Sequence, residues 1–256
     1  MSNKGNYRQD AIMKLLIQEK TVAVEELAKL FSVTPTTIRR DLLELEANHQ
    51  IIRSRGYAFL NEDYNTDDNR YRINMFHSEK QRIAKRAMQM VSSNSSLLLD
   101  SGTTILELAK ELNVHNEFRN ICIITNGLDV ALSLSGFSTV SMPPGVVDHY
   151  SKTIYGVKTT EFFSGIHADI AFIGSCGILH TNGPTISTPF LLDIKQKMIQ
   201  VSNKVILLID SSKFLSSGFY PFCDFNQIDA IITVETEENK ESIENLRNDG
   251  IEVILA

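Results

Sequence analysis

Two neighbouring arginines, Arg39 and Arg40, lie in a segment whose composition suits contact with double-stranded DNA, and Thr36 and Thr37 precede them. A guanidinium group forks onto guanine O6 and N7 or clamps a phosphate, while threonine contacts a phosphate or a thymine methyl group. These four side chains are therefore predicted to bind DNA, provided that the segment is a helix whose other face is apolar.

The residues around the arginines predict such a helix, running from Thr34 to about Ala47. Thr34 is a good N-cap and Pro35 suits the first helical position. The apolar residues recur at helical spacing, so they should face inward: Ile38, Leu42 and Leu45. Asp41 is expected to pair with a neighbouring arginine rather than contact DNA.

Helices are also expected over residues 7–19 and 24–31, and short strands at 51–52 and 58–60. Arg53 and Arg55 lie in the predicted turn between the strands, from which they would reach the minor groove or the DNA backbone. Three helices and a hairpin make a winged helix-turn-helix. An Arg-Arg pair alone is better explained as the solvated face of an ordinary helical bundle, but the capped helix, basic face and basic hairpin together favour DNA binding.

A run of small and hydroxyl residues follows the apolar segment 96–99 and opens a helix: Asp100, Ser101, Gly102, Thr103 and Thr104. The first turn of a helix has unpaired N–H groups and the positive end of the helix dipole, so this run is a candidate phosphate cradle. Helix capping explains such a string equally well.

Two more polar loops follow predicted strands: Thr125 with Asn126, and the loop that carries Lys213. Ligands of open α/β sheets bind beyond the carboxyl ends of the strands, so the three loops are expected to converge on one effector pocket. Lys213 would supply a point charge for a phosphate. Lys195, in a helix over 191–201, is a second candidate, and for each lysine alone an ordinary surface position is an equally good explanation.

Short, nearly all-apolar segments alternate with helical patterns beyond residue 76, which indicates a largely parallel sheet covered by helices. The predicted strands are 96–99, 121–125, 139–142, 169–174, 205–210, 230–233 and 252–255. The predicted helices are 77–91, 104–112, 128–134, 191–201 and 237–249. We thus expect an α/β protein with a winged helix-turn-helix DNA-binding domain (1–60), a polar linker (61–76) and a Rossmann-like effector-sensing domain (77–256).

The charge distribution agrees with this division. Residues 1–60 hold nine basic and seven acidic residues, whereas the remainder holds sixteen and twenty-four, for a net charge of −6. The longest apolar run falls short of the roughly 18 residues of a membrane span, and the three cysteines have no metal-ligand spacing. We expect a cytoplasmic protein with no membrane association, metal or cofactor.

The segments 24–28, 31–34, 37–42 and 45–46 together resemble the N-terminal signature of the DeoR family of sugar-responsive transcriptional repressors. The resemblance implies that the helix carrying Thr36 to Arg40 enters the major groove. The chain departs from the family at the wing tip, where Ser54-Arg55-Gly56-Tyr57 stands in place of a His-Gly-Gly string, and it lacks the usual glycine at His49 or Gln50.

The second part of the chain resembles the DeoR sensor domain, on matches at 100–104, 125–126, 151 with 156, 172–174 and 210–214, so that the likeness spans about residues 7–255. It implies a fold like that of ribose-5-phosphate isomerase and a homo-oligomer, dimer or tetramer, bound to an operator. It also implies repression of carbohydrate uptake or catabolism genes and release by a phosphorylated sugar. Pro143-Pro144-Gly145 replaces the family's Gly-Gly loop, and proline lacks an N–H donor.

A sugar-phosphate isomerase-like enzyme is the alternative. Such an isomerase needs a carboxylate base near the sugar carbonyl, and the matching stretch, Gly174-Ser175-Cys176-Gly177, lacks the expected acidic pair. Cys176 as a nucleophile would need a histidine base, and His149, His167 and His180 are near only in sequence, which favours an inert thiol. We therefore predict no catalytic residue.

Overall fold

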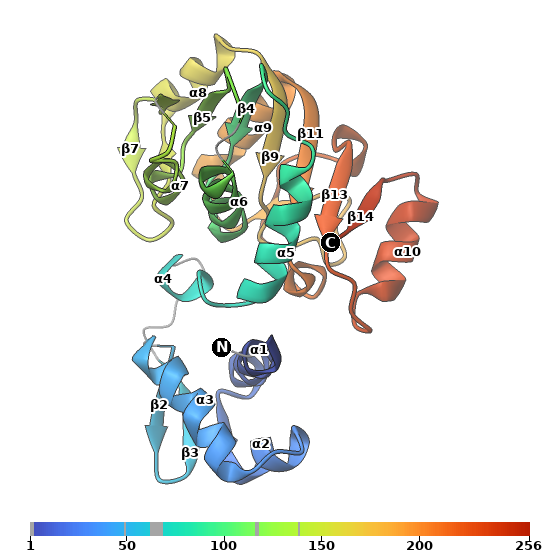
Figure 1. Ribbon diagram of the computed structural model, residues 1–256. Coiled ribbons are helices and arrows are strands. Elements are labelled where there is room, and N and C mark those ends of the chain that lie inside the picture. Colours follow the sequence, from blue (N-terminus) through green and yellow to red (C-terminus); the bar gives the residue numbers. More distant parts are fainter. Residues whose placement is uncertain (1–2, 49, 62–68, 116–117, 138) are drawn as a thin grey trace. The chain divides into compact units, whose positions relative to one another are not determined.

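The computed structural model describes residues 3–48, 50–61, 69–115, 118–137 and 139–256. The chain divides into two compact units, Met1–Ser78 (unit 1) and Glu79–Ala256 (unit 2), and each is considered by itself. Figure 1 shows the elements of both. Much of the linker predicted at 61–76 lies outside the described residues, since 62–68 are not among them. The domain bounds given above therefore remain a prediction.

Unit 1 is a winged helix-turn-helix, as the sequence predicts. Its elements are α1 (Asn3–Glu19), β1 (Thr21–Ala23), α2 (Val24–Leu30), α3 (Pro35–Ala47), β2 (Ile51–Ser54), β3 (Tyr57–Leu60) and α4 (Asn69–Arg72). The three strands form an antiparallel sheet in the order β1-β3-β2. Strand β1 was not predicted, because three residues are too few for a period-2 pattern to be read.

Helix α3 begins and packs for the reasons that the sequence supplies. The hydroxyl oxygen of Thr34 accepts a hydrogen bond from the Thr37 amide at 3.3 Å, and Pro35 occupies the first turn. Ile38, Leu42 and Leu45 are at most 3% exposed and join the core formed with α1 and α2. Complete burial of a side chain of this size contributes about 1.5–3 kcal/mol, so this stripe fixes which face of α3 is turned outward.

Unit 2 is an α/β structure built on one parallel sheet. Its larger elements are α5 (His77–Met88), β4 (Ser96–Leu99), α6 (Thr103–Val114), β5 (Cys122–Thr125), α7 (Leu128–Ser133), β6 (Val140–Ser141), α8 (Val157–Ser164), β9 (Ala168–Ile173), α9 (Leu192–Gln200), β11 (Ser202–Leu208), β13 (Ala230–Thr233), α10 (Lys240–Asn248) and β14 (Val253–Leu255). The smaller ones are β7 (Val146–Val147), β8 (Ile154–Tyr155), β10 (Thr185–Ile186), β12 (Tyr220–Pro221) and the 3-10 turns η1 (Pro189–Leu191), η2 (Ser211–Phe214) and η3 (Phe225–Gln227).

All seven predicted strands are present, in the order β14-β13-β11-β9-β4-β5-β6, with parallel pairing throughout. From β4 the chain passes through α6 to β5 on one side, and from β9 it passes through α9 to β11 on the other. The winding direction therefore reverses between β4 and β9, which is where open α/β sheets form a ligand crevice beyond their carboxyl ends. Figure 1 shows α5 and α6 in front of this sheet and α9 behind it.

Helix α8 and the antiparallel pairs of two-residue strands, β7 with β8 and β10 with β12, were not predicted. The segment 157–164 is rich in valine, threonine and phenylalanine, which favour strands by propensity, and tertiary packing overrides that preference. Phe163 at the end of α8 is fully buried in the same core as Met198 of α9. No helix in the described part of the chain combines the length and the apolar character needed to cross a bilayer.

Candidate functional site

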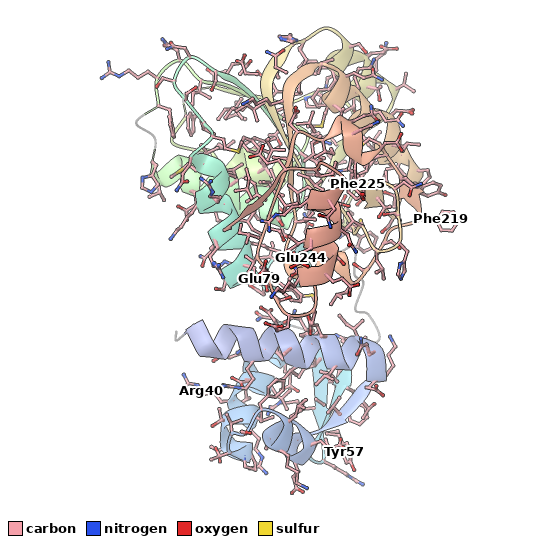
Figure 2. The ribbon with its side chains drawn as sticks, turned by 90° about the vertical axis from the view of Figure 1, so that its right-hand side faces the viewer. Arg40, Tyr57, Glu79, Phe219, Phe225 and Glu244 are labelled. Carbon is pink, nitrogen blue, oxygen red and sulfur yellow. The ribbon has the colours of Figure 1, made fainter. Side chains whose placement is uncertain are left out.

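The outer face of α3 presents the basic residues that the sequence assigned to DNA. Arg39, Arg40 and Thr36 are exposed, whereas Thr37 is half-buried because it takes part in the N-terminal cap. Arg40 lies 3.8 Å from Glu44, but 77% of its side chain is accessible, so this pair is a weak one that leaves the guanidinium available. Figure 2 shows Arg40 at the surface of unit 1.

Helix α3 is held against α1 by a partly buried ion pair. Arg8 donates from Nε and Nη2 to the two carboxylate oxygens of Asp41, the second at 3.0 Å. Hydrogen bonding to Asp41 raises the pKa of Arg8 above its ordinary value, although partial burial opposes this. Asp41 does pair with an arginine, as expected, but the partner comes from α1 rather than from α3. The pair compensates the charge of the buried Asp41 carboxylate.

The wing places only one of its two arginines at the tip. Arg53 lies within β2, opposite Ala58, and its guanidinium pairs with Glu46 at 2.7 Å, so the prediction that it sits in the turn is wrong. Hydrogen bonds from Arg53 hold the pKa of Glu46 below its ordinary value. The turn itself is Arg55-Gly56, with φ angles of 46° and 85°. Such a pair of positive φ values is typical of a two-residue hairpin loop.

In unit 2, the loops that follow β4 and β9 are joined by a buried ion pair. The ammonium group of Lys195 donates to the Asp100 carboxylate and, at 2.9 Å, to the Gly174 carbonyl oxygen. Asp100 also accepts a hydrogen bond from the Gly174 amide at 3.0 Å. Lys195 is 5% exposed and Asp100 is 1% exposed. The explanation of Lys195 as an ordinary surface lysine is therefore wrong.

The first and second predicted loops meet at the start of α6. Gly102 precedes this helix with a φ of 114°, a conformation that favours glycine, and no side chain caps the helix. A Cβ atom on Gly127 would lie 3.1 Å from the Ser101 Cα atom, so the two loops approach closely. Thr103 and Thr104 are buried in the first turn of α6. The uncapped N-terminus of α6 and the loop that carries Thr125 and Asn126 thus lie next to each other.

Thr125 and Asn126 differ in what they offer a ligand. The hydroxyl oxygen of Thr125 accepts the Gly127 amide at 3.0 Å and is committed to the turn. Asn126 is 1% exposed, and its Oδ1 atom has no hydrogen-bond partner among the described residues. A buried polar atom without a partner costs roughly 1–3 kcal/mol. Asn126 is therefore the better candidate for contact with a bound polar group.

The third loop is rigidly formed around Asp210. Its carboxylate accepts from the Ser212 amide at 3.1 Å, and the Lys213 amide donates to the Asp210 carbonyl oxygen at 3.1 Å. Burial by itself would raise the pKa of Asp210, but the charges of Lys213 and Lys80 and the hydrogen bonds from Ser212 hold it below its ordinary value. Lys213 itself is half-exposed, as a residue that meets a soluble ligand would be.

Sequence reasoning missed two buried charged residues at the start of α5. Glu79 is 4% exposed and Lys80 is 3% exposed. The burial of Lys80 could have been predicted from the sequence, because helical spacing places Lys80 on the same face as the fully buried Ile83, Ala84 and Ala87. Charged residues on an inward face are almost never buried unless they are paired, so their position points to partners elsewhere in the fold.

The lowered pKa of Asp210 gives a testable pH dependence. Because the folded-state pKa lies below that of the unfolded chain, the stabilisation is complete above the unfolded value, about 3.9, and is lost as the pH falls through the folded value. Urea midpoints measured from pH 6 down to pH 3.5 should therefore fall more steeply for wild type than for Asp210→Asn. Equal slopes would contradict the proposed charge interactions of Asp210.

The altered loop at 143–145 and the hairpin after it lie beside Asn126. The Ile154 amide donates to the Asn126 carbonyl oxygen at 2.7 Å. A Cβ atom on Gly145 would lie 2.3 Å from the Thr159 hydroxyl oxygen, so glycine is required there. His149 and Tyr150, weighed earlier for selectivity, are exposed and contact each other edge to face.

The segment that follows β9 is occupied by structural hydrogen bonds. The Ser175 hydroxyl bridges the carbonyl oxygens of Gly177 and Thr185 at 3.0 Å each, and the Ser187 hydroxyl donates to Cys176 Sγ at 3.4 Å. Nearby, burial raises the pKa of the Cys223 thiol to about 12. No group of three His, Cys, Asp or Glu side chains among the described residues is arranged to hold a metal ion.

Comparison with known proteins gives matches along nearly the whole chain. Residues 8–63 match the DeoR-like helix-turn-helix domain, and residues 75–235 match the DeoR C-terminal sensor domain. The transcriptional repressor GlcR of Bacillus subtilis is 32% identical, over 96% of this chain and 94% of its own. The glycerol-3-phosphate regulon repressor of Escherichia coli K12 is 31% identical, over 90% and 91%.

Among solved structures, ribose 5-phosphate isomerase A from Methanocaldococcus jannaschii matches 54% of each chain, with a TM-score of 0.40 and 15% identity. The sorbitol operon regulator SorC from Klebsiella pneumoniae matches 95% of this chain and 99% of its own, with a TM-score of 0.39 and 11% identity. The two domain matches and the near full-length relatives suffice: the chain belongs to the DeoR family of transcriptional regulators.

Proposed function

We propose that this protein represses genes for carbohydrate uptake or catabolism by binding an operator through α3 and its wing. The observation that carries the proposal is the exposed basic face of α3, with Arg39 and Arg40 turned away from a fully buried apolar stripe. Thr36 and Thr37 join this surface from the first turn of the helix, and Arg55 joins it from the wing tip. Arg53 contributes by ordering the wing against Glu46.

We further propose that a phosphorylated sugar binds at the carboxyl edge of the sheet and lowers operator affinity. The open N-terminus of α6 suits a phosphate, and Lys213 of η2 and Lys195 of α9 supply positive charge. The pocket residues are Asp100, Ser101, Gly102, Thr103, Thr104, Thr125, Asn126, Lys195 and Lys213. Relatives named as repressors, one of them of a glycerol-3-phosphate regulon, support a phosphorylated effector.

The same site is proposed to bind without catalysing a reaction. Asp100, the carboxylate that follows β4, is engaged by Lys195 and by the Gly174 amide, which leaves it poorly placed as a proton acceptor. The segment Gly174–Gly177 supplies no acid. Turnover of sugar phosphates by the full chain would contradict this part of the proposal.

The active species is proposed to be a homo-oligomer, dimer or tetramer. Two winged helices on one assembly would match operator half-sites spaced by about one helical turn of DNA, or by multiples of it. Since chromosomal DNA is its target, the protein is assigned to the cytoplasm. Half-site symmetry in duplexes selected from a random pool by the full chain tests the oligomer directly.

A thermal-shift screen tests the effector. A sugar phosphate at about 100 times its dissociation constant should stabilise the chain by about 2.7 kcal/mol, or roughly 5–10 °C. The panel is D-glucose 6-phosphate, D-fructose 1-phosphate, D-fructose 6-phosphate and glycerol 3-phosphate, each against its unphosphorylated counterpart. Loss of a charged hydrogen bond costs about 1.5–3 kcal/mol, so Lys213→Ala should weaken binding roughly 10- to 150-fold. Lys204→Ala, an exposed lysine of β11, is the control.

A further inference from the structure

The short segment between Phe76 and Glu79 is fixed at both ends by hydrogen bonds to distant parts of the chain. At its first end, within unit 1, the Phe76 amide donates to the Asp10 carboxylate at 2.6 Å. Asp10 belongs to α1, and the Phe76 side chain is 3% exposed with the Lys14 ammonium group 5.1 Å from its ring centre. Phe76 is thus an integral part of the DNA-binding unit.

At its second end, within unit 2, Glu79 binds the loop 210–214, which carries Lys213 and is called the effector loop here. One carboxylate oxygen accepts the Ser211 amide at 2.8 Å, and the other accepts the Ser211 hydroxyl at 3.0 Å. Glu79 and Ser211 are 4% and 1% exposed. Hydrogen bonds to an ionised carboxylate are about twice as strong as neutral ones, and here both oxygens are used on one residue. Glu79 is labelled in Figure 2.

Ser211 is not an incidental partner. It lies between Asp210 and Lys213 in η2, the turn from which Lys213 is proposed to reach a phosphate. The Ile178 amide donates to the Lys213 carbonyl oxygen at 2.8 Å, so the turn is connected on its other side to the segment after β9. A displacement of Lys213 toward an anion therefore acts on Ser211 and, through two hydrogen bonds, on Glu79.

Only His77 and Ser78 separate the two anchors along the chain. Three residue steps span at most about 11 Å even when fully extended, so Phe76 and Glu79 can move only a short distance relative to each other. Phe76 also adopts a φ of 52°, which a bulky residue rarely takes unless its surroundings impose it. The chain between the anchors is therefore short and conformationally restricted at its first residue.

We propose that Glu79 is the positioning residue that couples effector occupancy to the DNA-binding unit. It does so because its carboxylate binds Ser211 of the effector loop only three residues after Phe76. The inference rests on the proposed function above. An effector shifts operator affinity only if it binds two conformations of the protein unequally. The hydrogen bonds between Glu79 and Ser211 would supply that difference, because they join the effector loop to residues 76–79.

The test compares wild type with Glu79→Gln in the full chain. Both are titrated onto a duplex selected from a random pool by wild type, with and without the panel member that gives the largest thermal shift. Wild type should lose about 5- to 150-fold in duplex affinity with that sugar phosphate, the range of typical allosteric coupling. Glu79→Gln should lose less than about twofold, while its separate affinities for the duplex and the sugar phosphate stay within about threefold of wild type.

Glu161→Gln is the matched control, because Glu161 pairs with Lys158 at 2.7 Å on an exposed face of α8 and should leave the release unchanged. Ser211→Ala removes one of the two hydrogen bonds. With the sugar phosphate, its loss of duplex affinity should lie between those of wild type and Glu79→Gln. This variant keeps the proposal testable if Glu79→Gln does not fold. Hydrogen exchange supplies an independent readout: protection of the Phe76 amide should change on adding the sugar phosphate in wild type and stay constant in Glu79→Gln.

The outcomes separate the two proposals. If no panel member releases wild type from DNA, the proposed function fails and the coupling role falls with it. If wild type and Glu79→Gln are released equally, only the coupling role is overturned. If Glu79→Gln loses affinity for the sugar phosphate itself, Glu79 belongs to the pocket, and the coupling role is again overturned.

Discussion

Replacing Arg39 and Arg40 together by alanine is expected to abolish sequence-specific DNA binding while leaving the fold intact. Each bidentate contact to guanine discriminates by about 1–3 kcal/mol, so the pair accounts for roughly 2–6 kcal/mol, or about 30-fold to more than 10,000-fold in affinity. Neither arginine lies in the core of unit 1, so thermal stability should change little. Fluorescence anisotropy with selected and scrambled duplexes measures the effect.

The control for this variant is Lys85→Ala with Lys204→Ala, which removes the same formal charge from exposed positions of α5 and β11. It separates base recognition from the overall electrostatic attraction of DNA, which depends on salt. Wild-type preference for the selected duplex in the Arg39 and Arg40 variant would defeat the assignment of α3 as the reading helix.

Replacing Lys195 by methionine is expected to destabilise the chain by about 3–5 kcal/mol, because a buried carboxylate is left without its cation. Asp100 is 1% exposed, and among the described residues it then keeps a hydrogen bond from the Gly174 amide alone. The variant should also lose sugar-phosphate affinity, since a positive charge leaves the proposed pocket. Urea unfolding of the full chain and calorimetry measure the two effects separately.

The double variant Lys195→Met with Asp100→Asn provides the decisive comparison. Asparagine still offers an acceptor to the Gly174 amide and carries no charge, so much of the lost stability should return while sugar-phosphate binding stays weak. Lys197→Met, on the same helix with its ammonium group 2.8 Å from Gln200, is the control and should be near wild type. If the double variant is no more stable than Lys195→Met, the cost does not arise from an uncompensated charge.

The sequence alone determined the elements whose information is local. The cap at Thr34, the proline after it and the apolar stripe through Ile38 and Leu42 predict α3 and the face that Arg39 and Arg40 share, because helical periodicity relates residues only three or four positions apart. The seven strands of unit 2 were predicted for the same reason, and their parallel arrangement brings the polar loops to one edge of the sheet.

Only the tertiary structure decided which charges meet. Lys195 and Asp100 are 95 residues apart, and Glu79 and Ser211 are 132 residues apart, so no periodic pattern connects them. Arg53 was expected in the turn, yet it lies in β2, two residues before the turn begins at Arg55, and it pairs there with Glu46. Strand register decides where a hairpin turns. Side-chain pairing across layers follows from the order of strands and the faces that the helices cover, and both are properties of the assembled sheet.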